Sequence, residues 1–245
     1  LGQDLLGALA DDDSIAGGVY VIYQNWDNIV GYFRDKVQRI RDAFDGMRDT
    51  LKGTGHFFNT NRDRLDRIAA NYGNVGIAVS DGNTTVAAGR TAPETAWSTS
   101  KVPVLIAAHR AGLIGPDVVT SAITYSNNEA AQSAWDALGG GAQAAQAAQQ
   151  VLAEAGDTTT QVQSQVTRPE FTAFGQTMWS VGNQAKFMAG LRCVDGAQPI
   201  IDAMGVADPA QAYGLRTLPG ALMKGGWGPS PAGAYDVRQM GIVQL

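Results

Sequence analysis

The chain has 245 residues, of which 44% are hydrophobic and 17% charged, so it can bury a sizeable globular core. Its net charge of −5 argues against a nucleic-acid-binding protein, which would carry a basic patch. One cysteine, Cys193, excludes an internal disulfide, and we expect it to be buried as a small hydrophobic residue. Two histidines disfavour a histidine-based triad or a His-rich zinc site, so we expect no metal and no cofactor.

The first quarter of the chain predicts an extension, a strand and a long helix. Residues 1–17 form the N-terminal extension, with a short helix at Leu5–Leu9. The β-branched and aromatic run Val19–Tyr23 indicates a buried strand. Apolar residues at alternating steps of four and three then predict an amphipathic helix from Asn25 to Leu51. Gly53-Thr54-Gly55 ends it.

The first residues lack the basic segment and long apolar run of a secretory signal peptide. We therefore expect a mature or trimmed form from which a signal segment is absent. No apolar run reaches membrane-spanning length, so we expect no membrane span in this chain.

The middle of the chain predicts a helix, a hairpin and a second helix. The first helix covers roughly Thr60–Asn71. Two short strands, Val75–Val79 and Thr84–Ala88, flank the turn Asp81-Gly82-Asn83. The next helix runs from Ser98 to about Ala111.

The second half predicts a helical region followed by two strands. Residues 116–192 are rich in Ala and Gln and mainly helical, with breaks at Gly139-Gly140-Gly141 and near Pro169. The closing strands cover about Ala221–Lys224 and Val237–Val243.

Ser98-Thr99-Ser100-Lys101 is the first motif with chemical meaning. Its Ser and Lys are three residues apart, so they share one face of a helix. A lysine whose pKa is lowered by burial can take the proton of a serine hydroxyl, which makes the serine a nucleophile. The N-terminus of the helix adds free N–H groups that suit an anionic intermediate. A solvated Ser beside an exposed Lys is the alternative.

Two further motifs follow in the sequence. Ser126 and Asn128 are separated by one residue on a predicted turn, where they can supply a proton relay and a substrate-holding amide. The alternative is an ordinary helix N-cap. Lys224-Gly225-Gly226-Trp227 ends the predicted strand, where glycines let a ligand approach. The backbone N–H groups of Trp227 and Ser98 could together bind an oxyanion; the alternative is a strand end entering a turn.

Ser-x-x-Lys, Ser-x-Asn and Lys-x-Gly in this order resemble the signature of the class A β-lactamase and penicillin-binding-protein family. The hairpin Val75–Arg90, the segment Ala122–Ala131 and the strand Arg238–Val243 are also similar to that family, so the resemblance covers about residues 60–245. It implies an α/β (α+β) fold: an antiparallel five-stranded sheet flanked by helices, plus an all-helical subdomain at residues 100–192. The β-lactamase-like domain would cover residues 18–245.

The resemblance also implies roles. Ser98 would be acylated with Lys101 as its base, and Ser126 would relay a proton to the leaving nitrogen with help from Lys224. Asn128 would hold the amide side chain of the substrate. The expected substrate-binding residues are Asn128, Lys224, Gly225, Gly226 and Trp227.

The sequence departs from the family at several positions. Gly225 stands where the family usually has a hydroxyl residue, which removes one charged hydrogen bond to a substrate carboxylate, worth roughly 1.5–3 kcal/mol. Glu170, in Arg168-Pro169-Glu170, is the candidate base for the deacylating water, and a surface glutamate after a proline is the alternative. Asn127 replaces the usual Asp. These departures allow acylation and disfavour fast β-lactam hydrolysis.

The family's last strand lies mid-sheet, between its first and fourth strands, yet this sequence has no strand after Val237–Val243. A gap there would leave unpaired strand edges in the core. We expect Val19–Tyr23 to fill it, so that residues 18–55 replace the family's C-terminal strand and helix by circular permutation, with Gly53-Thr54-Gly55 as the join. The alternative is a helical module at residues 1–55 fused to a lactamase-like domain.

The sequence therefore predicts a serine acyl-transfer hydrolase whose partner is a β-lactam or a peptidoglycan stem peptide ending in D-alanine. We expect an extracytoplasmic protein, periplasmic or secreted, that binds no nucleic acid. The alternative is a non-catalytic β-lactamase-like binding module for the cell wall or a protein partner, contacted through residues 1–55.

Overall fold

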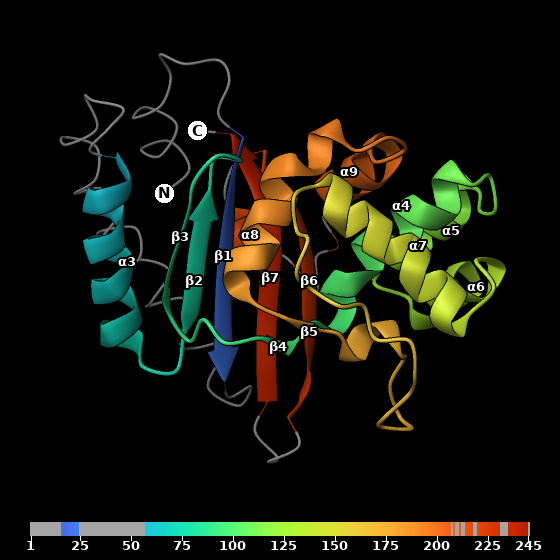
Figure 1. The fold of residues 1–245 in the computed structure, drawn as a ribbon, viewed down its shortest axis with the longest axis horizontal. Coiled ribbons are helices and arrows are strands. Elements are labelled where there is room, and N and C mark those ends of the chain that lie inside the picture. The colour runs from blue at the N-terminus through green and yellow to red at the C-terminus, as the bar shows by residue number, and fades with distance from the viewer. Residues whose placement is uncertain are drawn as a thin grey trace.

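The computed structural model describes residues 16–24, 57–206, 208, 211, 214–217, 220–230 and 235–244. These residues form a mixed α/β fold, as predicted, in which an antiparallel sheet packs against a group of helices (Figure 1). The helices expected at Leu5–Leu9 and Asn25–Leu51, and the join Gly53-Thr54-Gly55, lie outside the described residues.

The main sheet has five strands in the order β3-β2-β1-β7-β6. The strands are β1 (Ala16–Gln24), β2 (Gly76–Ser80), β3 (Thr85–Gly89), β6 (Leu222–Pro229) and β7 (Tyr235–Gln244). A small second sheet pairs β4 (Glu94–Thr95) with β5 (Met178–Trp179). The predicted β2–β3 hairpin is confirmed. In its turn, Asp81 Oδ1 accepts hydrogen bonds from the backbone N–H groups of Asn83 and Thr84 at 2.8 and 2.7 Å.

Strand β1 lies in the middle of the sheet. Gly18 is opposite Ser80 of β2 on one side and Ile242 of β7 on the other, and β1 pairs with β7 over its whole length. The expectation that Val19–Tyr23 lies between the two neighbouring strands is thus confirmed, although the strand extends further at both ends. Because β1 is there, the facing backbone groups of β2 and β7 are paired rather than exposed in the core.

Strand β6 forms one edge of the sheet, and the sequence prediction placed its end wrongly. Lys224-Gly225-Gly226-Trp227 lies inside the strand, which continues to Pro229 opposite Tyr235. The glycines do not end β6, because the register with β7 continues past them. At position 226 the absence of a side chain instead allows the close approach of another element, described below.

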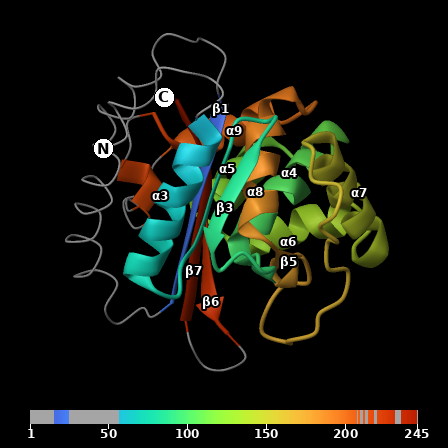
Figure 2. The same ribbon diagram turned by 60° about the vertical axis from the view of Figure 1, so that its left-hand side comes forward.

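Helices α3 (Phe57–Tyr72) and α8 (Val181–Gly190) lie on opposite faces of the sheet (Figures 1 and 2). Side chains of β7 alternate between the two faces. Met240 and Ile242 join the large core under α8, whereas Val243 packs with Leu215 and Met223 on the other face. The strand pattern of period two therefore gives the sheet two apolar faces, each covered by other elements.

The helical subdomain lies beside β6 (Figure 1). Its helices are α4 (Lys101–Arg110), α5 (Pro116–Ile123), α6 (Asn128–Ala137), α7 (Gly141–Glu154) and α9 (Gln198–Gly205). Short 3-10 turns are η2 (Trp97–Ser100), η3 (Phe174–Gln176), η4 (Leu191–Cys193) and η6 (Gly214–Thr217). Helix α4 is buried on all sides over its first eight residues, which makes it the central helix of this part. Helical structure continues past the expected limit at residue 192 to Gly205.

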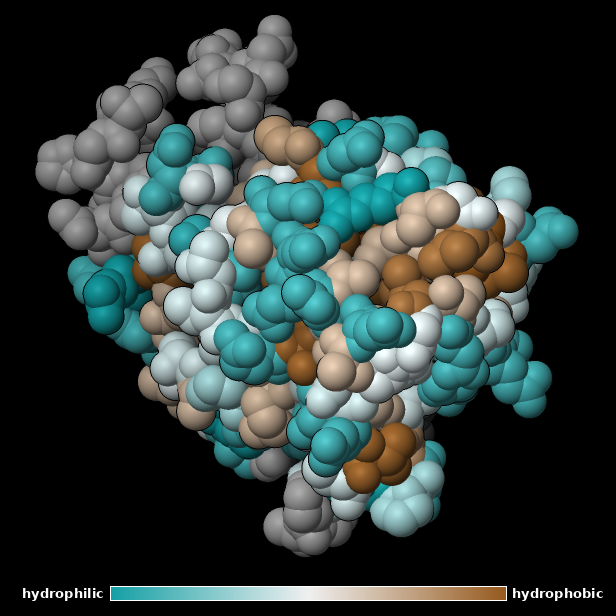
Figure 3. All heavy atoms as spheres, turned by 45° about the vertical axis from the view of Figure 1, so that its right-hand side comes forward, coloured by the Kyte–Doolittle hydropathy of each residue, from teal (hydrophilic) through white to brown (hydrophobic). Residues whose placement is uncertain are grey.

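The face on the helical side is mostly hydrophilic, with hydrophobic residues in separate patches (Figure 3). Cys193 is exposed, so the expectation of a buried cysteine is wrong; within η4 the buried position is taken by Leu191. In the part of the chain that the structure describes, no helix combines the length and the apolar character needed to cross a bilayer.

Candidate active site

The Ser98 motif lies where η2 leads into α4. The predicted helix begins with a tighter turn, because Trp97–Ser100 is 3-10 and the α-helix starts only at Lys101. The hydroxyl of Thr99 donates back to the carbonyl of Ala96, and that of Ser100 donates to the carbonyl of Trp97 at 2.7 Å. Ser98 is therefore the hydroxyl residue of this motif whose side chain is available to the neighbouring pocket.

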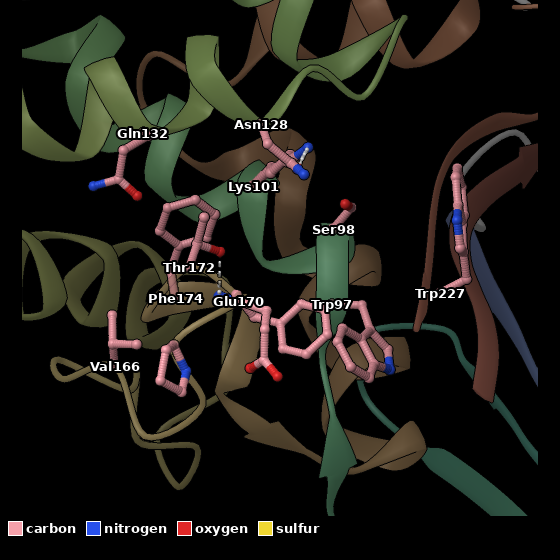
Figure 4. A pocket seen from close by; sticks show the side chains of 13 residues that line it. Trp97, Ser98, Lys101, Asn128, Gln132, Val166, Glu170, Thr172, Phe174 and Trp227 are labelled. Atoms are coloured by element: carbon pink, nitrogen blue, oxygen red, sulfur yellow. Dashed lines mark hydrogen bonds between the residues drawn. The ribbon is translucent and has the colours of Figure 1, made fainter. Parts of the chain in front are cut away.

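That pocket has a volume of about 510 Å³ and lies between η2, the start of α6 and the loop that precedes η3 (Figure 4). Ser98, Lys101, Asn128 and Gln132 contribute its polar side. Val166, Pro169, Phe171 and Phe174 contribute an apolar side, and Trp227 of β6 stands across from them. A pocket with one apolar wall and a few convergent polar groups is the usual form of a small-molecule site.

Lys101 is buried, with a side chain that ends among oxygen atoms. Its Nζ donates to the backbone carbonyl of Ser126, to the carbonyl of Asn127 at 3.2 Å and to Asn128 Oδ1 at 2.8 Å, and it lies 3.4 Å from Ser126 Oγ. Burial lowers the pKa of Lys101 from 10.5 to about 7. The three donated hydrogen bonds use all three protons of the ammonium form, so Lys101 must give up one of these bonds to act as a base. The lowered pKa places this loss of a proton near neutral pH.

Ser126 lies in the loop between α5 and α6 and bridges two buried amines. Its Oγ accepts a hydrogen bond from Lys224 Nζ at 2.8 Å, in addition to the longer one from Lys101. Its backbone has a left-handed φ of 56°, a strained value for a residue other than glycine. A hydroxyl has two lone pairs and one proton, so while Ser126 Oγ accepts from Lys224 its own proton can still be donated.

Lys224 is buried on β6, where its Nζ also donates to the carbonyl of Gly225 at 3.0 Å. Burial lowers the pKa of Lys224 well below 10.5, the charges of Lys101 and Arg216 lower it further, and Asp208 opposes them. Two amines that share one serine hydroxyl in a buried site favour an anion nearby, because a negative charge relieves their repulsion.

The turn of the second motif is a helix N-cap, as the alternative interpretation predicts, and it also contacts Lys101. Asn127 is the N-cap of α6, and its Oδ1 accepts from the N–H of Ala130 at 2.8 Å. Asn128 is the first residue of α6, and its side chain instead binds Lys101. The same turn thus caps a helix and holds a lysine.

The glycines of the third motif differ in their surroundings. A Cβ atom at position 226 would stand 2.8 Å from the backbone nitrogen of Ser98, so only glycine allows β6 and η2 to approach this closely. At Gly225 the nearest atom to such a Cβ would be 3.7 Å away, which leaves room for a side chain. Because Gly226 directly precedes Trp227, this close approach places the β6 backbone at Trp227 near the N–H of Ser98.

The structure does not join Ser98 to its expected partners. Among the described residues, no hydrogen bond links Ser98 Oγ to Lys101 or Ser126, although Figure 4 shows the hydroxyl on the side of the pocket where Lys101 and Asn128 end. Glu170 lines the pocket, but it is exposed and its carboxylate points away from Ser98 and Lys101 (Figure 4).

Gln176 accounts for the path of the Glu170 loop, and sequence reasoning missed it. Its Oε1 accepts from the N–H groups of Thr167 and Arg168, and its Nε2 donates to the carbonyls of Arg168, Phe171 and Thr172. The buried amide thus ties the loop on both sides of Glu170. A buried glutamine leaves no pattern in the sequence, so nothing there could have indicated it.

Among the described residues, no cluster of three or more His, Cys, Asp or Glu side chains could hold a metal ion. Apart from the exposed carboxylate of Glu170, the polar side chains of the pocket carry amines, amides and hydroxyls, which suit an organic anion or a carbonyl compound.

No family model and no curated protein matches the sequence. Similar solved structures include a variant of the last common ancestor of Gram-negative bacteria β-lactamase class A, bound to a nitrobenzotriazole transition-state analogue, with 19% identity over 76% of this chain and 88% of that one, at a TM-score of 0.48. A mutant of PBP-A in an acyl-enzyme complex with penicillin G has 19% identity over 76% and 88% of the two chains, at 0.47. PBP-A itself has 15% identity over 99% of this chain and 86% of that one, at a TM-score of 0.44. At these TM-scores the likenesses carry no argument about the site, whose chemistry rests on its own geometry.

Proposed function

We propose that the protein is a serine acyl-transfer hydrolase of the penicillin-recognising type, in which a β-lactam or a D-alanyl peptide acylates Ser98. The observation that carries this proposal is the hydroxyl of Ser126, which bridges the buried amine of Lys224 and the amine of Lys101. Lys101 itself lines the pocket together with Ser98. Such an array supplies a base for the nucleophile and a proton for the leaving group. We propose an extracytoplasmic location, where such substrates are found.

The acylation step uses these groups in turn. Neutral Lys101 takes the proton of Ser98, and Ser98 Oγ forms a bond to the substrate carbonyl carbon. The backbone N–H groups of Ser98 and Trp227 stabilise the oxyanion. Ser126 then gives its proton to the leaving nitrogen as the C–N bond breaks, and a protonated lysine restores the Ser126 proton. Asn128 holds the amide of the substrate side chain, and the carboxylate of the substrate favours the protonated form of Lys224, which attracts it.

We propose that the acyl-enzyme persists. Hydrolysis of the ester needs a base beside the ester carbon, and the carboxylate of Glu170 points away from Ser98. If this is right, replacing Glu170 by Gln changes the lifetime of the adduct little, whereas a deacylating base at this position would make the adduct at least tenfold longer lived on replacement.

The test is labelling with a fluorescent penicillin, followed by intact-mass measurement. One adduct is expected on the unaltered protein and none on Ser98→Ala. Ser100→Ala is the matched control, because it removes a hydroxyl of the same motif that is bonded to the Trp97 carbonyl. Labelling of Ser98→Ala would rule out Ser98 as the nucleophile.

A non-catalytic binding module for the cell wall or a protein partner is the second candidate. It is favoured by Lys101, whose amine is held by oxygens of residues 126–128 and not by Ser98. Absence of any adduct, together with reversible binding of penicillin or of stem peptide, would support this function and contradict the first.

We further infer that the chain is a circular permutation of the family it resembles. Support comes from β1, which lies between β2 and β7 with Ala16 opposite Gln244. A rearranged chain in which residues 57–245 come first, followed by a short linker and residues 1–56, is therefore expected to fold and to keep the same reactivity. Failure of that rearranged chain to fold would contradict the inference.

A further inference from the structure

We infer that Arg168 is a positioning residue, which holds Trp97 in a strained backbone conformation and thereby sets the orientation of Ser98. The inference rests on the proposed role of Ser98 for its effect on rate, and on the contacts of Arg168 for everything else. The guanidinium of Arg168 lies over Trp97 and Phe171, which line the pocket, so we assign its effect to Trp97 and not to direct contact with a substrate.

Trp97 precedes Ser98 and has a φ of 50°. A left-handed φ in so bulky a residue is an outlier that persists only where the surroundings enforce it. Gly228 of β6 lies against the indole, since a Cβ there would be 2.5 Å from ring atoms. Phe171 meets the same indole edge to face, with centroids 5.0 Å apart and planes at 77°.

Arg168 connects these groups. Its guanidinium carbon lies 4.5 Å from the ring centroid of Phe171 and 5.7 Å from that of Trp97, both within cation–π range. Its Nη1 donates to the carbonyl of Pro229 at 2.7 Å, one residue beyond Gly228. A planar guanidinium can stack on rings and donate from its edge at the same time, which an ammonium group cannot do.

Arg168 is also held at its backbone. Gln176 accepts from its N–H at 2.8 Å and donates to its carbonyl at 3.2 Å. The residue is thus anchored at one end in the loop and at the other on β6, with Trp97 enclosed between them. The side chain of Arg168 therefore connects its own loop to the edge strand β6 and to η2.

Without Arg168, Trp97 loses the contact that ties it to both the loop and β6, while its contacts with Gly228 and Phe171 remain, so its backbone has more freedom to relax. Relaxation would rotate the peptide bond between Trp97 and Ser98, moving both the N–H and the hydroxyl of Ser98. A displacement of about 1 Å at a reacting group costs roughly a hundredfold in rate. Because Lys101 is held by residues 126–128, its pKa should not change.

The experiment compares Arg168→Ala and Arg168→Lys with the unaltered protein in three measurements: the acylation rate constant across pH, rescue by added guanidinium, and hydrogen exchange of the peptide containing Trp97–Lys101. Arg110→Ala is the matched control, because Arg110 pairs with Glu154 at 2.6 Å at the far end of α4.

We expect both Arg168 variants to lose about tenfold to hundredfold in acylation rate with an unshifted pH midpoint. Guanidinium, and not ammonium, should restore part of the rate to Arg168→Ala. Exchange should speed up at Trp97–Lys101 and not in Gly76–Gly89, while Arg110→Ala behaves as the unaltered protein. Full activity of Arg168→Lys, or unchanged exchange at Trp97–Lys101, overturns the inference. If the unaltered protein is not acylated, the proposed function fails, and the exchange measurement still decides the role of Arg168.

Discussion

At the scale of single residues, the site depends on Lys101 and Lys224, whose pKa values are lowered by burial. The pKa of Lys101 is lowered to about 7 because its amine is desolvated. Its oxygen neighbours come from the turn at Ser126–Asn128, so the turn holds the amine while burial adjusts its basicity. The same residue can therefore be held as an ammonium at low pH and act as a base at higher pH.

We predict that acylation depends on pH through Lys101. Below about pH 7 the amine is mostly protonated, so the acylation rate should rise about tenfold per pH unit and then level off above that pH. Stopped-flow acylation between about pH 5 and pH 9 measures this. Lys101→Arg should be inactive throughout, because a guanidinium stays protonated. A rate independent of pH over this range would contradict Lys101 as the base.

We predict that Gly225→Ser improves binding of a substrate carboxylate. The site has room for a Cβ at 3.7 Å from its nearest neighbour, and one charged hydrogen bond is worth roughly 1.5–3 kcal/mol, or about tenfold to a hundredfold in affinity. Affinity for a carboxylate-bearing β-lactam, measured from the concentration dependence of acylation, tests it. Gly226→Ser is the control and should lose activity, because its Cβ would collide with Ser98. Equal effects of the two changes would contradict this interpretation of Gly225.

The co-location of the motifs could be predicted from sequence, whereas the bonds between them could not. The fold brings Ser126 into contact with Lys101, which lines the pocket of Ser98, and with Lys224 of β6. The direction of the Lys101 amine and of the Glu170 carboxylate depends on tertiary contacts. The direction of the Glu170 carboxylate depends on Gln176, which belongs to none of the motifs and holds the backbone on both sides of Glu170.

At the scale of elements, β6 is the surface against which η2 is pressed. Gly226 and Gly228 point toward η2 from alternate positions of the strand, and a side chain on either would meet Ser98 or Trp97. The sequence indicated that glycines here permit a close approach. It suggested a ligand as the approaching group, while at these positions the structure has the chain's own 3-10 turn. Element type was predictable from periodicity, and the end of β6 was not, since glycine also marks strand ends.

We predict that Gly228→Ala destabilises the protein by about 1–3 kcal/mol, the usual cost of overfilling a packed site. The added methyl group would stand 2.5 Å from the buried indole of Trp97, which Phe171 holds on another side. Urea unfolding measures the change. Gly225→Ala is the matched control on the same strand and should lie within about 0.5 kcal/mol of the unaltered protein. A stable Gly228→Ala protein would show that Trp97 can move.

At the scale of the whole molecule, the sheet is completed by residues from the beginning of the chain. The need for a strand between Val75–Val79 and Val237–Val243 could be argued from sequence, because an open mid-sheet position would leave backbone groups unpaired. The run Val19–Tyr23 was identifiable as a strand by its residue types. Its exact ends were not, since pairing with β7 also includes Ala16, Gly17, Gly18 and Gln24, which have weak strand propensity.

We predict that deletion of residues 1–24 abolishes cooperative unfolding. It removes β1 and exposes the facing edges of β2 and β7 inside the sheet, which should cause aggregation. Deletion of residues 1–15 keeps β1 and is the control, with cooperative unfolding expected to remain. Circular dichroism during heating, together with size-exclusion chromatography, distinguishes the outcomes. If the protein that lacks residues 1–24 is folded and monomeric, the sheet does not need β1.

The position of β1 has a consequence for biosynthesis. Gly18 pairs with Ile242, so the middle of the sheet joins residues separated by almost the whole chain. During synthesis β1 leaves the ribosome before β2 and β7, so the edge of β1 that pairs with β7 stays unpaired until β7 has emerged. Contacts so distant in sequence slow folding and prolong exposure to aggregation. The protein should therefore depend on chaperones during synthesis more than a chain of the same fold in which these two strands are adjacent.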